Sequence, residues 1–163
     1  MKPAPPERLL ALVNLCEGTA RRILEEQGGL SAMAFIGSEG AFGIMPVGHL
    51  PKNAVKPIVH KIAREQDADF VLMVMECWAL DERYADQLEQ LRARYGQLSD
   101  MPAPYVYEAV SFGLDTHDGT WMGIAKIFQR PDGAKSFEHV ALTMFGLSEG
   151  RMVGMLPPRS TRQ

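Results

Sequence analysis

The residue of this sequence that most invites a chemical role is Glu76, a single acid inside the apolar run Phe70–Leu80 (FVLMVMECWAL). A run that is apolar at successive positions is typical of a strand covered on both faces of a sheet. A lone carboxylate there costs free energy unless it has a partner. We expect Glu76 to act as an acid, a base or a ligand, to pair with a nearby Lys, Arg or tryptophan N–H, or to emerge where its strand is less covered.

Glu108 is the second acid of interest, because it comes close to Glu76 if their strands pair. Glu76 lies four residues before the end of its predicted strand, and Glu108 lies three residues after the start of the next. Antiparallel pairing would therefore place the two at similar depth. Two carboxylates held close together are the arrangement that general acid/base sites use. Glu76 and Glu108 are the candidate catalytic residues, with or without a divalent metal.

Glu108 also belongs to a group of charged residues within strands, together with Lys126 and Glu138. If their three strands are neighbours, these side chains could form a Glu–Lys–Glu row across the sheet. Opposite charges in cross-strand positions stabilise a sheet, which is a sufficient structural reason for such a row. A polar site on the sheet is the other reading.

The histidines do not form a recognisable metal-binding motif. His49, His60, His117 and His139 lack the short ligand spacing of zinc sites, so any metal site would have to be assembled by the fold. The segment Asp115–Gly119 (DTHDG) has the residues of a cation-binding loop, but also those of an ordinary turn. We expect no metal and no cofactor.

Nucleophile and phosphate-binding patterns are also missing from the sequence. Ser111 is not part of a G-x-S-x-G elbow, and no base is marked for Cys77. The glycines of Gly37–Gly43 follow neither the dinucleotide nor the phosphate-loop pattern. Cys16 and Cys77 are both expected to be buried free thiols.

Length and charge narrow the class of protein. The chain has 163 residues with 17 basic and 20 acidic side chains, a net charge of −3. This length fits one domain. The number of basic residues does not exceed the number of acidic ones, so the sequence does not predict a basic surface for binding nucleic acid. The N-terminal MKPAPPER is not a signal peptide, and no segment reads as a membrane helix. We expect a cytoplasmic protein that binds neither nucleic acid nor membranes, with disordered tails at residues 1–5 and 157–163.

Three helices are predicted from apolar spacing and end signals. The first runs from Pro6 to Gln27, with its apolar stripe facing the core and Glu17 outside that stripe. The second covers Asn53 to Gln66. The third, Glu82 to Tyr95, is capped by Asp81 and is otherwise highly charged.

The remaining segments predict strands. Their expected ranges are Leu30–Ile36, Ala41–Val47, Asp69–Leu80, Tyr105–Leu114, Thr120–Gln129, Ser136–Phe145 and a short last strand at Arg151–Leu156. Tight turns rich in Gly, Asp and Pro join several of them, and such hairpins force antiparallel pairing. The sequence therefore predicts an α+β fold, a mostly antiparallel sheet of five to six strands with two to three helices, in the order α-ββ-α-β-α-βββ(β). This order is similar to those of roadblock-like and profilin-like domains, which are scaffolds for association.

One central segment resembles part of a family. The pieces are Glu76-Cys77-Trp78, then Tyr107-Glu108-Ala109-Val110 and the hairpin residues Asp118-Gly119. They resemble a stretch of about fifty residues in uncharacterised small α+β proteins of phage and bacterial genomes. In that family an alanine stands at the position of Cys77 and a basic residue at that of Tyr107, and the connecting segment is shorter. The resemblance implies a small α+β fold and a phage or mobile-element origin, and it assigns no activity.

Two functions remain open on the sequence. The leading hypothesis is a non-enzymatic domain that self-associates, as a homodimer, or binds a protein partner, because a domain with many strands has edges that must be covered. The alternative is a small hydrolase that uses Glu76 and Glu108. The sequence identifies neither a substrate nor a partner.

Overall fold

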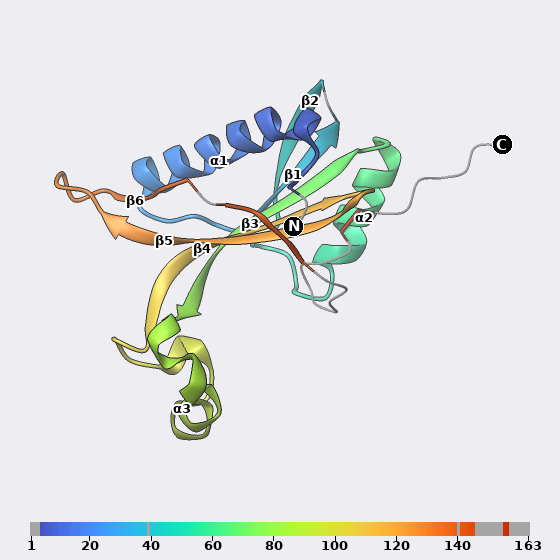
Figure 1. The fold of residues 1–163 in the computed structure, drawn as a ribbon. Coiled ribbons are helices and arrows are strands. Elements are labelled where there is room, and N and C mark those ends of the chain that lie inside the picture. Colours follow the sequence, from blue (N-terminus) through green and yellow to red (C-terminus); the bar gives the residue numbers. More distant parts are fainter. Residues whose placement is uncertain (1–3, 39, 140, 146–154, 157–163) are drawn as a thin grey trace.

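The computed structural model describes residues 4–38, 40–139, 141–145 and 155–156 and confirms the α+β fold, with the elements in the predicted order (Figure 1). The helices are α1 (Glu7–Gln27), α2 (Val55–Glu65) and α3 (Leu88–Tyr95), with 3-10 helices η1 (Glu82–Gln87) and η2 (Leu98–Asp100) around α3. The strands are β1 (Met33–Ser38), β2 (Ala41–Pro46), β3 (Phe70–Leu80), β4 (Val106–Thr116), β5 (Gly119–Gln129), β6 (Lys135–Phe137) and β7 (Thr143–Phe145).

The strands form one antiparallel sheet in the order β2-β1-β3-β4-β5-β6, and β7 also pairs with β5. The six strands of this order agree with the five to six expected, and among the described residues the predicted strand Ser136–Phe145 is divided into β6 and β7. β6 pairs with the end of β5 and β7 with its start. The predicted strand Arg151–Leu156 and the predicted tails lie mostly outside the described residues.

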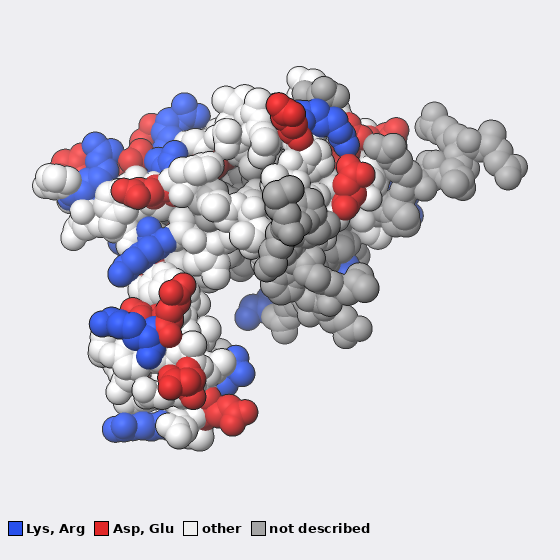
Figure 2. All heavy atoms as spheres, viewed as in Figure 1, with Lys and Arg blue, Asp and Glu red and all other residues white. Residues whose placement is uncertain are grey.

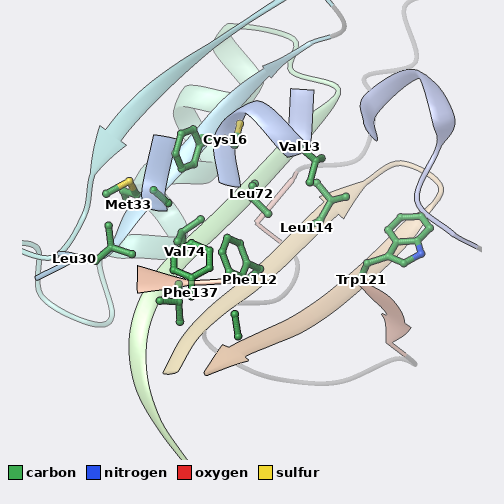
Figure 3. Packing of buried hydrophobic residues seen from close by; sticks show 14 of the residues in the cluster. Val13, Cys16, Leu30, Met33, Leu72, Val74, Phe112, Leu114, Trp121 and Phe137 are labelled. Carbon is green, nitrogen blue, oxygen red and sulfur yellow. The ribbon is translucent and has the colours of Figure 1, made fainter. Parts of the chain in front are cut away.

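Helix α1 covers one face of the sheet and forms the main core with it (Figure 3). Its buried stripe, which includes Val13 and Cys16, packs on the alternate residues of β3 and β4 that point to this face. These strand residues include Leu72, Val74 and Phe112. The helix ends at Gly28, whose positive φ of 74° and N–H bond to the Leu24 carbonyl are the features of a glycine cap.

Helix α2 covers part of the opposite face. Val59 and Ala63 pack there on Ile36, Val71 and Met73. Because β3 lies between these two layers, its residues from Phe70 to Val74 are all buried. The prediction of a central strand covered on both faces is therefore confirmed for the first half of β3.

The second half of β3 leaves this cover and enters an arm. β1 pairs with β3 only as far as Val74, so residues 75–80 have β4 as their only neighbouring strand among the described residues. At the end of the arm, residues 81–105 form η1, α3 and η2, which lie away from the body (Figure 1). The arm has a small core of its own around Leu91, Met101 and Val106.

Candidate functional site

Glu76 lies on the exposed part of β3, which is the alternative in which it emerges where its strand is less covered. Its position is the second in the segment that extends past β1, so water reaches the side chain. The Oε1 atom accepts a hydrogen bond of 3.1 Å from the backbone N–H of Leu30, in the connection between α1 and β1. Glu76 thus holds the start of the β1 hairpin against β3.

Glu108 lies on the same face of the sheet as Glu76, on the neighbouring strand. The register pairs Glu76 with Val110 and Trp78 with Glu108, so the two glutamates are diagonal neighbours. Each has a separate partner, because Glu108 Oε2 lies 3.3 Å from the Lys135 ammonium group. The structure brings the predicted pair to one face, where both side chains are exposed.

The row of Glu108, Lys126 and Glu138 is not formed. Lys126 is paired with Ala109, which places its side chain on the sheet face opposite to Glu108. Its ammonium group lies 5.3 Å from the ring centroid of Tyr107. Glu138 follows β6 and is exposed. Lys135, which sequence reasoning did not single out, takes the role of the cation beside Glu108.

The four histidines lie in different places. His49 is exposed in the loop after β2, and His60 is half-buried on α2. His117 Nε2 lies 3.3 Å from the Ala68 carbonyl at the β4–β5 turn. Among the described residues, no group of three or more His, Cys, Asp or Glu side chains could hold a metal ion.

Both cysteines are free, as expected. Burial raises the pKa of the Cys16 thiol to about 12. Burial also raises the pKa of the half-buried Cys77 thiol, against a lowering by its hydrogen bond with Ser111. Because the thiolate is the reactive form, neither cysteine is prepared as a nucleophile.

Sequence reasoning missed Glu17, which it placed outside the stripe of α1 that faces the core. The side chain of Glu17 is only 4% exposed. One carboxylate oxygen lies 3.1 Å from Arg21 Nη2, and the other lies 2.9 Å from His139 Nδ1. The helical spacing of the sequence did indicate that Glu17 lies on the buried side of α1, because it follows Val13 by four residues and precedes Ala20 by three.

Glu17 lies at a cavity of about 330 Å³ between α1 and the segment that joins β6 to β7. Its walls are mainly apolar, and Asn14, Glu17 and His139 supply its polar groups; the lining residues are Pro5, Leu10, Val13, Asn14, Glu17, Phe112, His139, Ala141 and Leu142. A mostly apolar cavity with a few polar groups is typical of small-molecule sites.

The second feature of interest is β2, the last strand at one edge of the sheet. Among the described residues it pairs only with β1. Residues 40–51 contain no Asp, Glu, Lys or Arg. Ile44 is 45% exposed, and Ala41, Gly43 and Pro46 are exposed as well.

The pairing register shows which peptide groups of β2 face outward. Ser38 pairs with Ala41 across the hairpin, and hydrogen-bonded and non-hydrogen-bonded pairs alternate from there. The Gly37 carbonyl accepts from the Asp69 N–H, so it points toward β3 and not toward its partner Phe42. Phe42 and Ile44 therefore direct their backbone N–H and C=O groups away from β1.

The opposite side of the sheet differs from the β2 edge. There β5 is covered by β6 and β7, which have only three residues each. Charged side chains surround β6, and both Arg130 and Lys135 form ion pairs. Figure 2 shows acidic and basic side chains of the described residues mixed over the face in view, without a continuous basic surface. None of the helices that the structure describes is long and apolar enough to cross a membrane.

Comparisons with protein-family models, with curated proteins and with solved structures gave no match for this chain. The resemblance to small phage and bacterial proteins therefore stays a prediction.

Proposed function

We propose that this protein is a self-associating domain that forms a homodimer in the cytoplasm through the outer edge of β2. The observation that carries this proposal is an edge strand with outward backbone groups and no charge between Gly40 and Pro51. Proteins usually protect such edges with lysines, bulges or covering segments, because a bare edge pairs with other strands.

A second copy of the chain is the partner that fits this edge best. An antiparallel pair of β2 strands around a two-fold axis presents the same surface from both copies, as in most soluble dimers. With the axis at Gly43, Phe42 of one copy lies opposite Ile44 of the other, and the outward peptide groups of both residues exchange hydrogen bonds. The sheets of both copies then become continuous, and the exposed Ile44 side chains gain apolar contacts.

The experiment uses proline at a position where it removes only an outward donor. Ile44→Pro deletes the N–H that points away from β1, so the β1–β2 ladder keeps its hydrogen bonds. Ile44→Val is the matched control, because it keeps the N–H and a β-branched side chain. Sedimentation velocity across the micromolar range should show a dimer for the wild type and for Ile44→Val, and a monomer for Ile44→Pro.

Circular dichroism checks that Ile44→Pro keeps the fold, and Ile44→Lys provides a second variant that places a charge on the edge. A wild-type protein that sediments as a monomer throughout the micromolar range overturns the proposal. A dimer that survives both Ile44→Pro and Ile44→Lys also overturns it, because the contact then lies elsewhere.

A further inference from the structure

A buried carboxylate and an exposed imidazole meet at the cavity between α1 and the β6–β7 connection. The two oxygens of Glu17 lie 3.1 and 2.9 Å from His139 Nδ1. The imidazole is 71% exposed and the carboxylate 4%. In hydrolytic sites, a buried carboxylate commonly binds one ring nitrogen of a histidine and so orients the other nitrogen to act as a base.

Core stability alone does not require this histidine. Arg21 already pairs with Glu17 at 3.1 Å, and its guanidinium lies 4.7 Å from the centre of the Phe137 ring. Arg21 Nε also donates to the Phe137 carbonyl at 2.6 Å. Glu17 is thus already paired with Arg21, whose guanidinium is held in place by the ring and the carbonyl of Phe137. His139 packs little against the core, and its imidazole lines the cavity.

The contact with Glu17 determines which nitrogen of His139 can act as a base. A carboxylate at Nδ1 favours the tautomer with its proton on that nitrogen, which leaves the lone pair on Nε2. Nε2 is then the basic atom, and Glu17 is a positioning residue that fixes the tautomer and the orientation of the ring.

We propose that this cavity hydrolyses small carboxylic esters with short apolar acyl chains, with His139 as the general base toward water. The volume of about 330 Å³ suits a small ligand. Leu10, Val13, Phe112 and Leu142 provide the apolar wall for the acyl chain. The Asn14 side chain, one helical turn before Glu17, also lines the cavity and offers an amide donor to the ester carbonyl oxygen.

Water is the nucleophile in this scheme, since no Ser, Thr or Cys is among the described residues that line the cavity. His139 Nε2 takes a proton from water while the water oxygen bonds to the acyl carbon. The tetrahedral intermediate then breaks its bond to the alcohol oxygen, and Nε2 returns the proton to that oxygen. The products are a carboxylic acid and an alcohol, and the imidazole is regenerated.

The experiment measures hydrolysis of p-nitrophenyl butyrate by the wild type and by His139→Ala. We expect saturation kinetics for the wild type and a loss of about 100-fold in kcat for His139→Ala, the scale of one general base. His49→Ala is the matched control, because His49 is also exposed and lies in a loop away from the cavity. Equal losses in both variants would show esterolysis by any surface imidazole and would overturn the proposal.

The role of Glu17 is tested by chemical rescue. Free imidazole should restore part of the activity of His139→Ala beyond the rate of imidazole alone, because the carboxylate is still present to orient it. The double variant Glu17→Gln with His139→Ala should not be rescued, with circular dichroism as the check on folding. Equal rescue of both variants overturns the positioning role, and wild-type activity no greater than that of His139→Ala overturns the site.

This inference is independent of the β2 edge, because the cavity lies on α1 and the β6–β7 connection. If it holds, the protein is the small hydrolase that was the alternative hypothesis from the sequence, with its site at His139 and Glu17 instead of Glu76 and Glu108.

Discussion

Glu76 lies where β3 passes the end of β1, and its carboxylate binds the backbone at the start of the β1 hairpin. The acid therefore has a local structural role that needs no burial. A hydrogen bond of this kind contributes about 0.5–1.5 kcal/mol to stability. The acceptor of this hydrogen bond is a side-chain oxygen, and a glutamine side chain has an oxygen at the same position.

We expect Glu76→Ala to lower the free energy of unfolding by about 1 kcal/mol, since the Leu30 N–H loses its acceptor. Glu76→Gln keeps an oxygen at the same place and should retain most of the stability. Urea denaturation of the three proteins measures the difference. Equal losses in the two variants would mean that the charge, and not the hydrogen bond, is what stabilises the fold.

Residue roles were only partly predictable from the sequence, for a physical reason. The apolar run around Glu76 indicates a strand, but it does not indicate at which residue the pairing with the neighbouring strand β1 ends. Glu17 presents the opposite case, because its spacing from Val13 and Ala20 puts it beside the buried stripe. Its partner His139 lies more than a hundred residues away, and only the fold brings that contact about.

At the scale of single elements, the β1–β2 hairpin depends on the absence of a side chain at Gly37. A Cβ atom there would lie 2.3 Å from the Ala41 carbonyl oxygen and 2.6 Å from the Cα of Phe42. Both are backbone atoms, so the strand itself would have to move. By contrast, a Cβ at Gly43 on β2 would meet no atom within 4 Å.

Gly37→Ala should therefore destabilise the protein by about 1–3 kcal/mol, the usual cost of overpacking a fitted position. Gly43→Ala is the matched control and should change stability by less than about 0.5 kcal/mol. Thermal or urea unfolding of the purified variants provides the comparison. A tolerated Gly37→Ala would show that the two strands can separate without cost.

The arm is a second element with its own stability, because the cluster around Leu91 shares no residue with the two clusters of the body. Leu91→Ala should raise hydrogen exchange within residues 82–100 and leave exchange in α1 and β3 unchanged. Leu24→Ala in α1 is the contrast, with a global loss of about 2–5 kcal/mol. If Leu91→Ala increases exchange throughout the chain, the arm and the body unfold together.

The elements themselves were the most predictable part. Apolar periodicity and glycine stops gave α1 within a residue of its observed ends, and turn residues gave the hairpins. The division of Ser136–Phe145 into β6 and β7 was not predicted, because nothing in the sequence indicates that His139, between them, contacts Glu17 of α1.

At the scale of the whole molecule, the two sides of the sheet differ: among the described residues β2 pairs only with β1, whereas the short strands β6 and β7 lie along β5. Each copy carries a net charge of −3, yet the proposed contact contains no charged side chain. The two copies therefore repel weakly at long range and associate through backbone groups and apolar side chains. Salt screens the first effect and has little influence on the second.

Raising NaCl from about 0.05 to about 0.5 M should leave the dimer dissociation constant unchanged or slightly lower, because only the repulsion is screened. Analytical ultracentrifugation at several protein concentrations gives this constant. A dimer that salt dissociates would be held by ion pairs and would not involve the β2 edge.

The arm also affects how the chain tolerates change. Leu80 and Val106 are direct neighbours in the β3–β4 ladder, and the Asp81 N–H already donates to the Tyr105 carbonyl. The two ends of the 81–105 segment thus meet at a spacing that a short β-turn can close. The helical tip is therefore a position at which a short turn can join β3 to β4 directly while Leu80 and Val106 remain paired.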